Sequence, residues 1–260
     1  MPAFGNLEKM HVVINGNYER HRRRLVDMIT DFDRSGEMLV KGKRNTIKIF
    51  PLNGKTVNIK AFRIPNAVNK LAYRYLRKSK ARRSFDYAKK LRTLGINTPE
   101  PIAFCEEHGL WGLNKSFYLS EHLNYQFSIR QPLEQKDFPN REEILRQFSR
   151  FTFHLHEKKV WFLDHSPGNT LIREDSNAQY QFYLVDINRM QFKNLSRKIR
   201  LENFARLSAD REALSTIGEE YATLSGWPKE ETTQAIVAAD QRFRDSRARK
   251  GWVKGVLGLK

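Results

Sequence analysis

The sequence predicts an α+β protein with two lobes, a small antiparallel β-sheet lobe with one helical insert followed by a mainly helical lobe. Strand-like alternation of apolar residues is concentrated in residues 37–62 and 102–123, whereas helical spacing dominates between them and again beyond residue 140. The lobes should meet at a hinge near residues 121–124. The expected divisions are an N-terminal extension (1–35), the sheet lobe (36–122), the helical lobe (123–240) and a basic C-terminal tail (241–260).

Three short strands are predicted at the start of the sheet lobe, over residues 37–40, 46–50 and 57–62. The turn between the second and third strands contains Asn53-Gly54, a strong signal for a two-residue hairpin because both residue types tolerate positive φ. A turn that contains Gly42 joins the first strand to the second. These features predict an antiparallel arrangement.

The helical insert is predicted after Pro65 as two consecutive helices. Leu71 lies on the apolar face of the first, and the second begins at Ser79. Gly95 is a natural helix stop, and the prolines that follow it prevent continuation. The last two strands of the sheet are expected over residues 102–106 and 116–123.

The helical lobe begins with an amphipathic helix around Phe148. A loop, "DHSPGN" (164–169), then leads into a hairpin whose strands are expected over 170–174 and 180–187. Beyond residue 196 the pattern is helical. The chain ends in a basic, amphipathic stretch that contains Trp252, a composition that suits a segment lying in a membrane interface.

The charge balance is strongly basic, with 47 Lys and Arg against 29 Asp and Glu, a formal net charge of +18 and a pI near 10.0. Such a field attracts polyanions, which include nucleic acids, anionic membrane surfaces and phosphorylated substrates. Neither an aromatic-rich single-strand motif nor a major-groove helix signature is present, so no specific nucleic acid is expected as a partner.

Cysteine content and hydropathy restrict the expected location of the protein. The single cysteine, Cys105, excludes an internal disulfide framework and a cysteine-based metal site, and we interpret it as a buried strand residue. The N-terminus lacks the pattern of a signal peptide, and no stretch approaches the ~20 apolar residues of a spanning helix. We therefore expect a cytoplasmic protein.

Four residues supply the parts that phosphoryl transfer requires, namely a carboxylate for the acceptor, oxygen ligands for Mg²⁺ and a cation for the phosphates. Asp164 and Asn169 lie in one loop, so the carboxylate can face the acceptor while the amide oxygen faces a metal. Asp186 ends the hairpin, which should return it to the side of Asn169 as a second metal ligand. Lys60, at the end of the third strand, can reach the phosphates, and backbone N–H groups of the Gly42 turn can cover them.

The order of these features resembles the protein-kinase-like fold, most closely the lipopolysaccharide kinase family that phosphorylates Kdo or heptose of the inner core. The similarity extends over roughly residues 36–206 and is clearest in "RKSKARRSFDYAKKLRTLGINTPEPIAF", "FLDHSPGNTLI" and "LVDINRM". By that resemblance Asp164 is the catalytic-loop aspartate, Asn169 and Asp186 are magnesium ligands, and Lys60 is the phosphate-binding lysine of a nucleotide-binding sheet lobe.

Three positions depart from the family pattern. Phe162 stands where the catalytic loop usually has His, and Asn188 replaces the glycine of the Asp-Phe-Gly triplet. Ser84 stands where relatives have a glutamate that pairs with the lysine. Asp86 is a poor substitute, because two positions correspond to about 200° around a helix.

Two histidines lie near the loop. We expect His156, near the end of the preceding helix, to hydrogen-bond the local backbone. His165 follows Asp164 directly, and its residue type is equally compatible with a substrate contact and with a structural role.

The resemblance implies an ATP- and Mg²⁺-dependent kinase for a sugar hydroxyl of the inner core, with Kdo as the first choice and heptose as the second. Its substrate would be the lipid A and inner-core glycolipid, and it would act as a peripheral protein at the cytoplasmic face of the inner membrane. Ten basic residues between positions 70 and 92 would attract that anionic surface, at roughly 1 kcal/mol each. The alternatives that stay open are a protein or small-molecule kinase of the same fold, a pseudokinase, and a non-catalytic polyanion- or RNA-binding protein.

Overall fold

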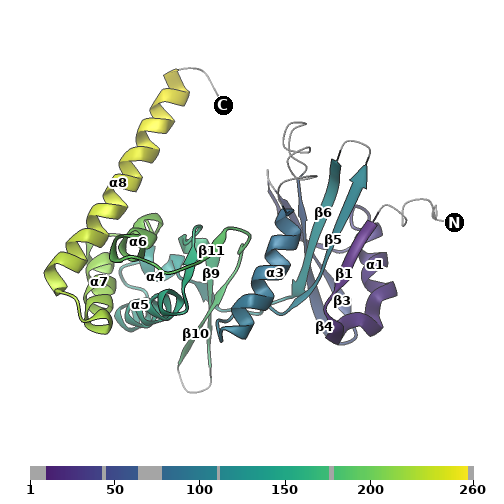
Figure 1. The fold of residues 1–260 in the computed structure, drawn as a ribbon, viewed down its shortest axis with the longest axis horizontal. Coiled ribbons are helices and arrows are strands. Elements are labelled where there is room, and N and C mark those ends of the chain that lie inside the picture. Colours follow the sequence, from purple (N-terminus) through teal and green to yellow (C-terminus); the bar gives the residue numbers. More distant parts are fainter. Residues whose placement is uncertain (1–9, 43–44, 64–77, 110–111, 176–178, 257–260) are drawn as a thin grey trace. The chain divides into compact units, whose positions relative to one another are not determined.

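The computed structural model describes residues 10–42, 45–63, 78–109, 112–175 and 179–256 (Figure 1). The chain divides into two compact units, Met1–Leu123 and Asn124–Lys260. The first unit contains β1 (Met10–Ile14), η2 (Gly16–His21), α1 (Arg22–Thr30), β2 (Glu37–Lys41), β3 (Asn45–Leu52), β4 (Lys55–Phe62), α3 (Lys80–Thr93), β5 (Pro101–Gly109) and β6 (Gly112–Glu121). The second contains β7 (Phe127–Ser128), α4 (Arg130–Glu134), α5 (Arg141–Glu157), β8 (Val160–Phe162), η3 (Pro167–Asn169), β9 (Thr170–Glu174), β10 (Tyr180–Leu184), β11 (Met190–Phe192), α6 (Arg197–Glu202), η4 (Asn203–Arg206), α7 (Arg211–Ser225) and α8 (Lys229–Val256).

The first unit is built on an antiparallel sheet with the strand order β1-β5-β6-β4-β3-β2. Its strands β2 to β6 are the five that the sequence predicts. Asn53 and Gly54, with φ of 45° and 78°, form the tight turn between β3 and β4. Of the helical insert, the first predicted helix, around Leu71, lies outside the described residues.

Helix α3 covers one face of this sheet. Its N-cap is Ser79, whose side chain accepts a hydrogen bond from the Arg82 amide, and Gly95 ends it in the left-handed conformation with φ of 75°. The predicted start and stop of this helix are therefore confirmed. Its apolar side packs Ala81 and Phe85 against strand residues of the sheet.

The opposite face of the sheet is covered by the N-terminal segment, which was expected from the sequence to be a separate extension (Figure 1). Strand β1 pairs with the edge of β5, and residues of α1, including Leu25 and Met28, share a core with Val57 and Ile59. Alternate strand residues point to opposite faces, so a sheet that buries one face on α3 exposes a second apolar face. The segment from Met10 onward buries that face and belongs to the sheet lobe.

A buried lysine fixes the end of α1 to the sheet. Lys48 on β3 is 7% exposed, and its Nζ donates to the carbonyl oxygens of Phe32 at 2.6 Å and Ser35 at 2.8 Å. The ammonium thereby satisfies carbonyl groups that follow the helix and have no helical partner.

The second unit surrounds an apolar core formed by α5, α7 and α8 together with the three-stranded sheet β10-β9-β7. The predicted hairpin is confirmed, with Thr170 opposite Leu184. Residues 241–256, assigned from the sequence to a separate basic tail, continue α8, whose end projects beyond the rest of this unit (Figure 1). No helix among the described residues has an apolar stretch long enough to cross a bilayer.

Candidate active site

The loop that carries Asp164 begins directly after β8, which pairs with β11. The pairing extends one residue further, since the Leu163 amide donates to the Arg189 carbonyl at 3.1 Å. Within the loop the Ser166 amide donates to the Asp164 carbonyl at 2.7 Å, and Pro167 begins the short helix η3. Proline suits this position because its missing N–H would have no helical partner. The loop is therefore a hydrogen-bonded turn that holds the Asp164 backbone in place.

Asn169 is oriented by the same loop. Its Nδ2 donates to the Asp164 carbonyl at 2.8 Å, which fixes the direction of the amide group. Oδ1 consequently faces away from that carbonyl, and no described residue donates a hydrogen bond to it. An amide oxygen without a protein donor beside two carboxylate residues is a suitable ligand for a hard cation.

Asp186 is brought to Asn169 by the β9–β10 hairpin. The amide of Val185 donates to the Asn169 carbonyl at 3.0 Å. Asp186 itself adopts the left-handed conformation, with φ of 55°, at a cost of roughly 1 kcal/mol for a residue other than glycine. The buried Asn188 supports this geometry, because its Nδ2 donates to Asp186 Oδ1 at 2.7 Å. The residue that replaces the family glycine thus orients the carboxylate.

Two arginines contact Asp164, and sequence reasoning missed both. Arg189 Nη1 lies 3.1 Å from Oδ1 and 3.4 Å from Oδ2. Arg206 Nη1 also bonds Oδ1, and it donates to the Leu163 carbonyl at 2.9 Å. Arg189 arrives through the β8–β11 ladder and Arg206 through η4, which lies 42 residues further along the chain. No local pattern could have identified them.

Three buried side chains are linked by hydrogen bonds to the backbone just before the loop. His156 Nδ1 is 2.7 Å from the Tyr221 hydroxyl, and Nε2 is 3.0 Å from Asn203 Oδ1. Asn203 Nδ2 donates to the Phe162 carbonyl at 2.8 Å. Since Asn203 donates there through nitrogen, its oxygen accepts from Nε2–H, and Nδ1 accepts from the hydroxyl. The expected backbone hydrogen bond of the His156 ring is therefore wrong, because both of its partners are side chains of distant elements.

Both histidines near the loop are neutral because they are buried. Desolvation lowers the pKa of His156 to about 4 and that of His165 to about 3. His165 is fully buried among the rings of Phe148, Phe162 and Phe204, and neither of its nitrogens has a hydrogen-bond partner among the described residues. Its role is structural, and it is not placed to contact a substrate.

Lys60 and Gly42 belong to the first unit. Lys60 lies on β4 between Ile47 of β3 and Tyr118 of β6, and its Nζ is 5.6 Å from the centre of the Phe62 ring. The amide of Gly42 donates to the Asn45 carbonyl at 3.0 Å, which closes the turn between β2 and β3. That Lys60 and the Gly42 turn bind the same nucleotide as Asn169 and Asp186 of the second unit stays a prediction.

Ser84 and Asp86 of helix α3 stand at or near the position where a glutamate partner for Lys60 was expected, and both side chains have other partners. Ser84 is buried, and its hydroxyl donates to the Lys80 carbonyl at 2.9 Å. Asp86 forms an ion pair with Lys78 at 2.7 Å. Within the described part of α3, the acid nearest to Ser84 is therefore already bound to another lysine.

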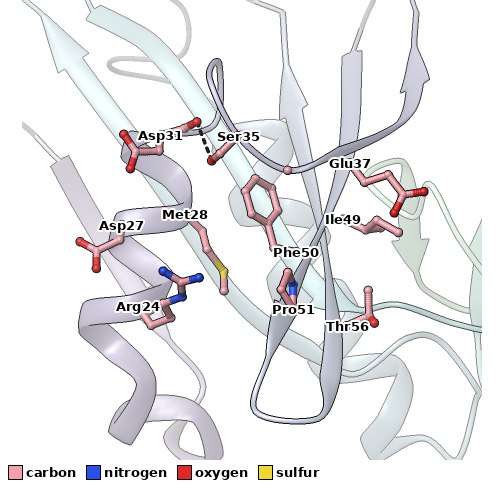
Figure 2. A pocket seen from close by; sticks show the side chains of 11 residues that line it. Arg24, Asp27, Met28, Asp31, Ser35, Glu37, Ile49, Phe50, Pro51 and Thr56 are labelled. Carbon is pink, nitrogen blue, oxygen red and sulfur yellow. Dashed lines mark hydrogen bonds between the residues drawn. The ribbon is translucent and has the colours of Figure 1, made fainter.

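A pocket of about 600 Å³ lies in the first unit between α1 and the β2–β3 region (Figure 2). Arg24 and Asp27 line it from α1 and Asp31 from the residue directly after that helix, and Phe50 and Glu37 line it from the strands. It contains none of the predicted site residues, so it is separate from the candidate site.

The sequence and the fold were compared with those of known proteins. The profile of the lipopolysaccharide kinase (Kdo/WaaP) family matches residues 52–237, a range that includes all the candidate residues except Gly42. Among solved structures, "WaaP in complex with acyl carrier protein" is similar, with a TM-score of 0.63 and 14% identity over 90% of this chain and 98% of that chain. The Rio2 kinase in an ADP/Mg²⁺-phosphoaspartate complex from Chaetomium thermophilum gives a TM-score of 0.45 and 18% identity over 85% of this chain and 75% of that chain. No curated protein sequence matches. The predicted protein-kinase-like fold is confirmed.

Proposed function

Because the chain belongs to the lipopolysaccharide kinase (Kdo/WaaP) family and is therefore a kinase, we propose that it transfers the γ-phosphoryl group of ATP to a hydroxyl of Kdo. The observation that carries this proposal is the juxtaposition of Asp164, Asn169 and Asp186, which are joined by hydrogen bonds of one loop and one hairpin. A carboxylate for the acceptor and oxygen ligands for magnesium are the groups that phosphoryl transfer requires. This arrangement favours a catalytic kinase over a non-catalytic polyanion-binding protein.

Asp164 would orient the acceptor hydroxyl and take its proton. Both arginines bond Oδ1, whereas Oδ2 has only the 3.4 Å contact with Arg189. Oδ2 is therefore the oxygen that can accept a hydrogen bond from a substrate.

Asn169 and Asp186 would hold Mg²⁺, and Lys60 and the Gly42 turn would bind the nucleotide phosphates. The described residues contain no group of three or more His, Cys, Asp or Glu side chains that could hold a metal. Magnesium keeps several waters and is bound by one or two protein ligands together with the phosphates of the nucleotide, so Asn169 and Asp186 would be sufficient protein ligands. The bound ion would neutralise charge on those phosphates.

The choice of Kdo over heptose, and of a membrane location, rests on charge. Kdo carries a carboxylate and heptose does not, and the two arginines at Asp164 suit an acidic sugar. At the end of α8, Trp252 and Val253 are 70% and 46% exposed among basic residues. Such a helix end suits peripheral attachment to the anionic cytoplasmic face of the inner membrane.

The test is phosphorylation of a lipid A inner core that carries both Kdo and heptose, by the purified protein with ATP and Mg²⁺. Mass spectrometry should detect one added phosphate on Kdo, and Asp164→Asn should reduce the rate by about 10²–10⁴-fold. Asp137→Asn is the matched control, since Asp137 is exposed and has no described partner. Phosphate on heptose, or none at all, would contradict the proposal.

Nucleotide binding provides an independent measurement. ATP with Mg²⁺ should raise the melting temperature of the wild type, and Asp186→Ala should remove the part of that shift that depends on Mg²⁺. An unchanged shift in Asp186→Ala would remove Asp186 from the magnesium site.

A further inference from the structure

Asp164 has more positive charge around it than its own carboxylate requires. Arg189 and Arg206 both contact one carboxylate, so two guanidinium groups face a single negative charge. One arginine would suffice to neutralise Asp164. The second adds a further positive charge in direct contact with the residue proposed to receive the acceptor proton.

Most of the donors of these two arginines are unused. A guanidinium has five N–H donors, and each arginine reaches its acceptors through Nη1 alone. Nε and Nη2 of both side chains have no acceptor among the described residues. The side chains of Arg189 and Arg206 are 53% and 34% exposed, so these donors are accessible to a ligand.

Both arginines are also held by contacts that do not involve the Asp164 carboxylate. The Arg189 carbonyl accepts from the Leu163 amide at 3.1 Å, which anchors its backbone to the loop. Arg206 bonds the Leu163 carbonyl, and its guanidinium carbon lies 5.4 Å from the centre of the Phe243 ring. The pair is thus positioned in advance beside Oδ2, the carboxylate oxygen with the fewest contacts.

We propose that Arg189 and Arg206 form an acceptor-anion site, which selects a hydroxyl that has a carboxylate or phosphate group close to it on the acceptor. The planar guanidinium fork matches both anions in a two-bond geometry. An anion held there brings the neighbouring hydroxyl to Asp164. This inference rests on the proposed function and deepens it, because it assigns the substrate preference to two residues.

The experiment compares three acceptors: a Kdo-bearing lipid A, the same molecule with its sugar carboxyl reduced to an alcohol, and the same molecule with its phosphates removed. The wild type should lose at least about tenfold in kcat/KM, mainly through KM, when the anion that is recognised is absent. Loss with the reduced acceptor identifies the carboxylate, and loss with the dephosphorylated acceptor identifies a phosphate.

Arg189→Gln should have a lower kcat/KM for the intact acceptor and should treat intact and anion-depleted acceptors alike, as expected when one partner of a coupled pair is removed. Arg206→Lys keeps the charge without the fork and should show a partial loss of discrimination. Arg173→Gln, an exposed arginine of β9 without a described partner, is the control and should behave as the wild type. Melting temperatures should establish that each variant is folded.

Two results separate this inference from the proposed function. A wild type that phosphorylates all three acceptors equally, or an Arg189→Gln that loses the same factor on each, would overturn the anion site while the kinase assignment stands. A wild type that phosphorylates no acceptor would overturn the proposed function itself.

Discussion

Asn203 donates a 2.8 Å hydrogen bond from its side chain to the carbonyl of Phe162, two positions before Asp164. Both residues are buried, and Asn203 is in turn bonded by His156, which is bonded by Tyr221. By the resemblance described above, a histidine is usual where Phe162 stands, and the phenylalanine side chain cannot donate a hydrogen bond there. The bond from Asn203 supports the loop backbone at this position.

Asn203→Ala should lower kcat by roughly tenfold and destabilise the protein by about 1–3 kcal/mol, because the Phe162 carbonyl and His156 Nε2–H would both lose their partner. The KM for ATP should not change if Asn203 acts only by positioning the loop. Asn203→Asp keeps an acceptor for His156 but no donor for Phe162, so it should share the loss of kcat. Steady-state kinetics and denaturant unfolding measure both effects, with the exposed Asn194→Ala as the control. If Asn203→Ala is destabilised but its kinetic constants do not change, the hydrogen bond from Asn203 to Phe162 contributes to stability and not to catalysis.

His165→Leu should stabilise the fold by about 1–3 kcal/mol near pH 7. The wild-type ring places two polar nitrogens without partners among phenylalanine rings, and leucine fills a similar space without that desolvation cost. Chemical denaturation gives the difference in unfolding free energy. A destabilised variant would indicate that the ring makes a hydrogen bond in solution, with water for example.

Stability should fall as pH decreases below about 6.5. The pKa of His165 is lowered to about 3 and that of His156 to about 4, so between these values and the unfolded value the unfolded chain binds more protons than the folded chain. In that window each histidine should make the free energy of unfolding decrease by up to about 1.4 kcal/mol for each pH unit by which the pH is lowered. His165→Leu should remove one of the two contributions, which unfolding curves at pH 4 to 7 would measure. Parallel pH profiles for the wild type and the variant would contradict the burial argument.

Lys48→Ala should destabilise the protein by about 2 kcal/mol or more, because two carbonyl groups at the end of α1 would lose a charged donor. The exposed Lys115, which pairs with Asp33 at the surface, provides the control. Lys115→Ala should lower the free energy of unfolding by at most about 1 kcal/mol. Equal effects in the two variants would show that Lys48 does not hold α1 to the sheet. Limited proteolysis near residue 33 would detect the release of α1.

Trp252→Ala should weaken binding to vesicles that contain phosphatidylglycerol by roughly tenfold, since the exposed indole at the end of α8 would no longer enter the interface. Binding should also decrease with salt and be weak on phosphatidylcholine vesicles. Leu224→Ala changes an exposed apolar residue of α7 and should bind as the wild type. If Trp252→Ala binds as tightly as the wild type, the end of α8 is not the membrane contact.

The first unit shows how far local sequence patterns reach. Asn53-Gly54, Ser79 and Gly95 determine a turn, a helix start and a helix stop through their own backbone preferences, and each is found where it was expected. The role of the N-terminal segment was missed, although Leu25, Met28, Ile29 and Phe32 recur at helical spacing. Their burial depends on a sheet face formed by strands β3 to β6, which follow later in the chain and which periodicity by itself does not reveal.

In the second unit the sequence determined the loop, the hairpin and the residue types of the candidate site, because a tight turn and a two-stranded ladder are local structures. It also determined the net charge and the order of elements by which the chain resembles its family. Only the tertiary structure decided that Arg189 and Arg206 converge on Asp164, that Asn188 orients Asp186, and that Tyr221, His156 and Asn203 support Phe162. Most of these contacts join side chains that lie far apart in the chain, and they follow from which element packs against which, a consequence of core burial rather than of any local residue pattern.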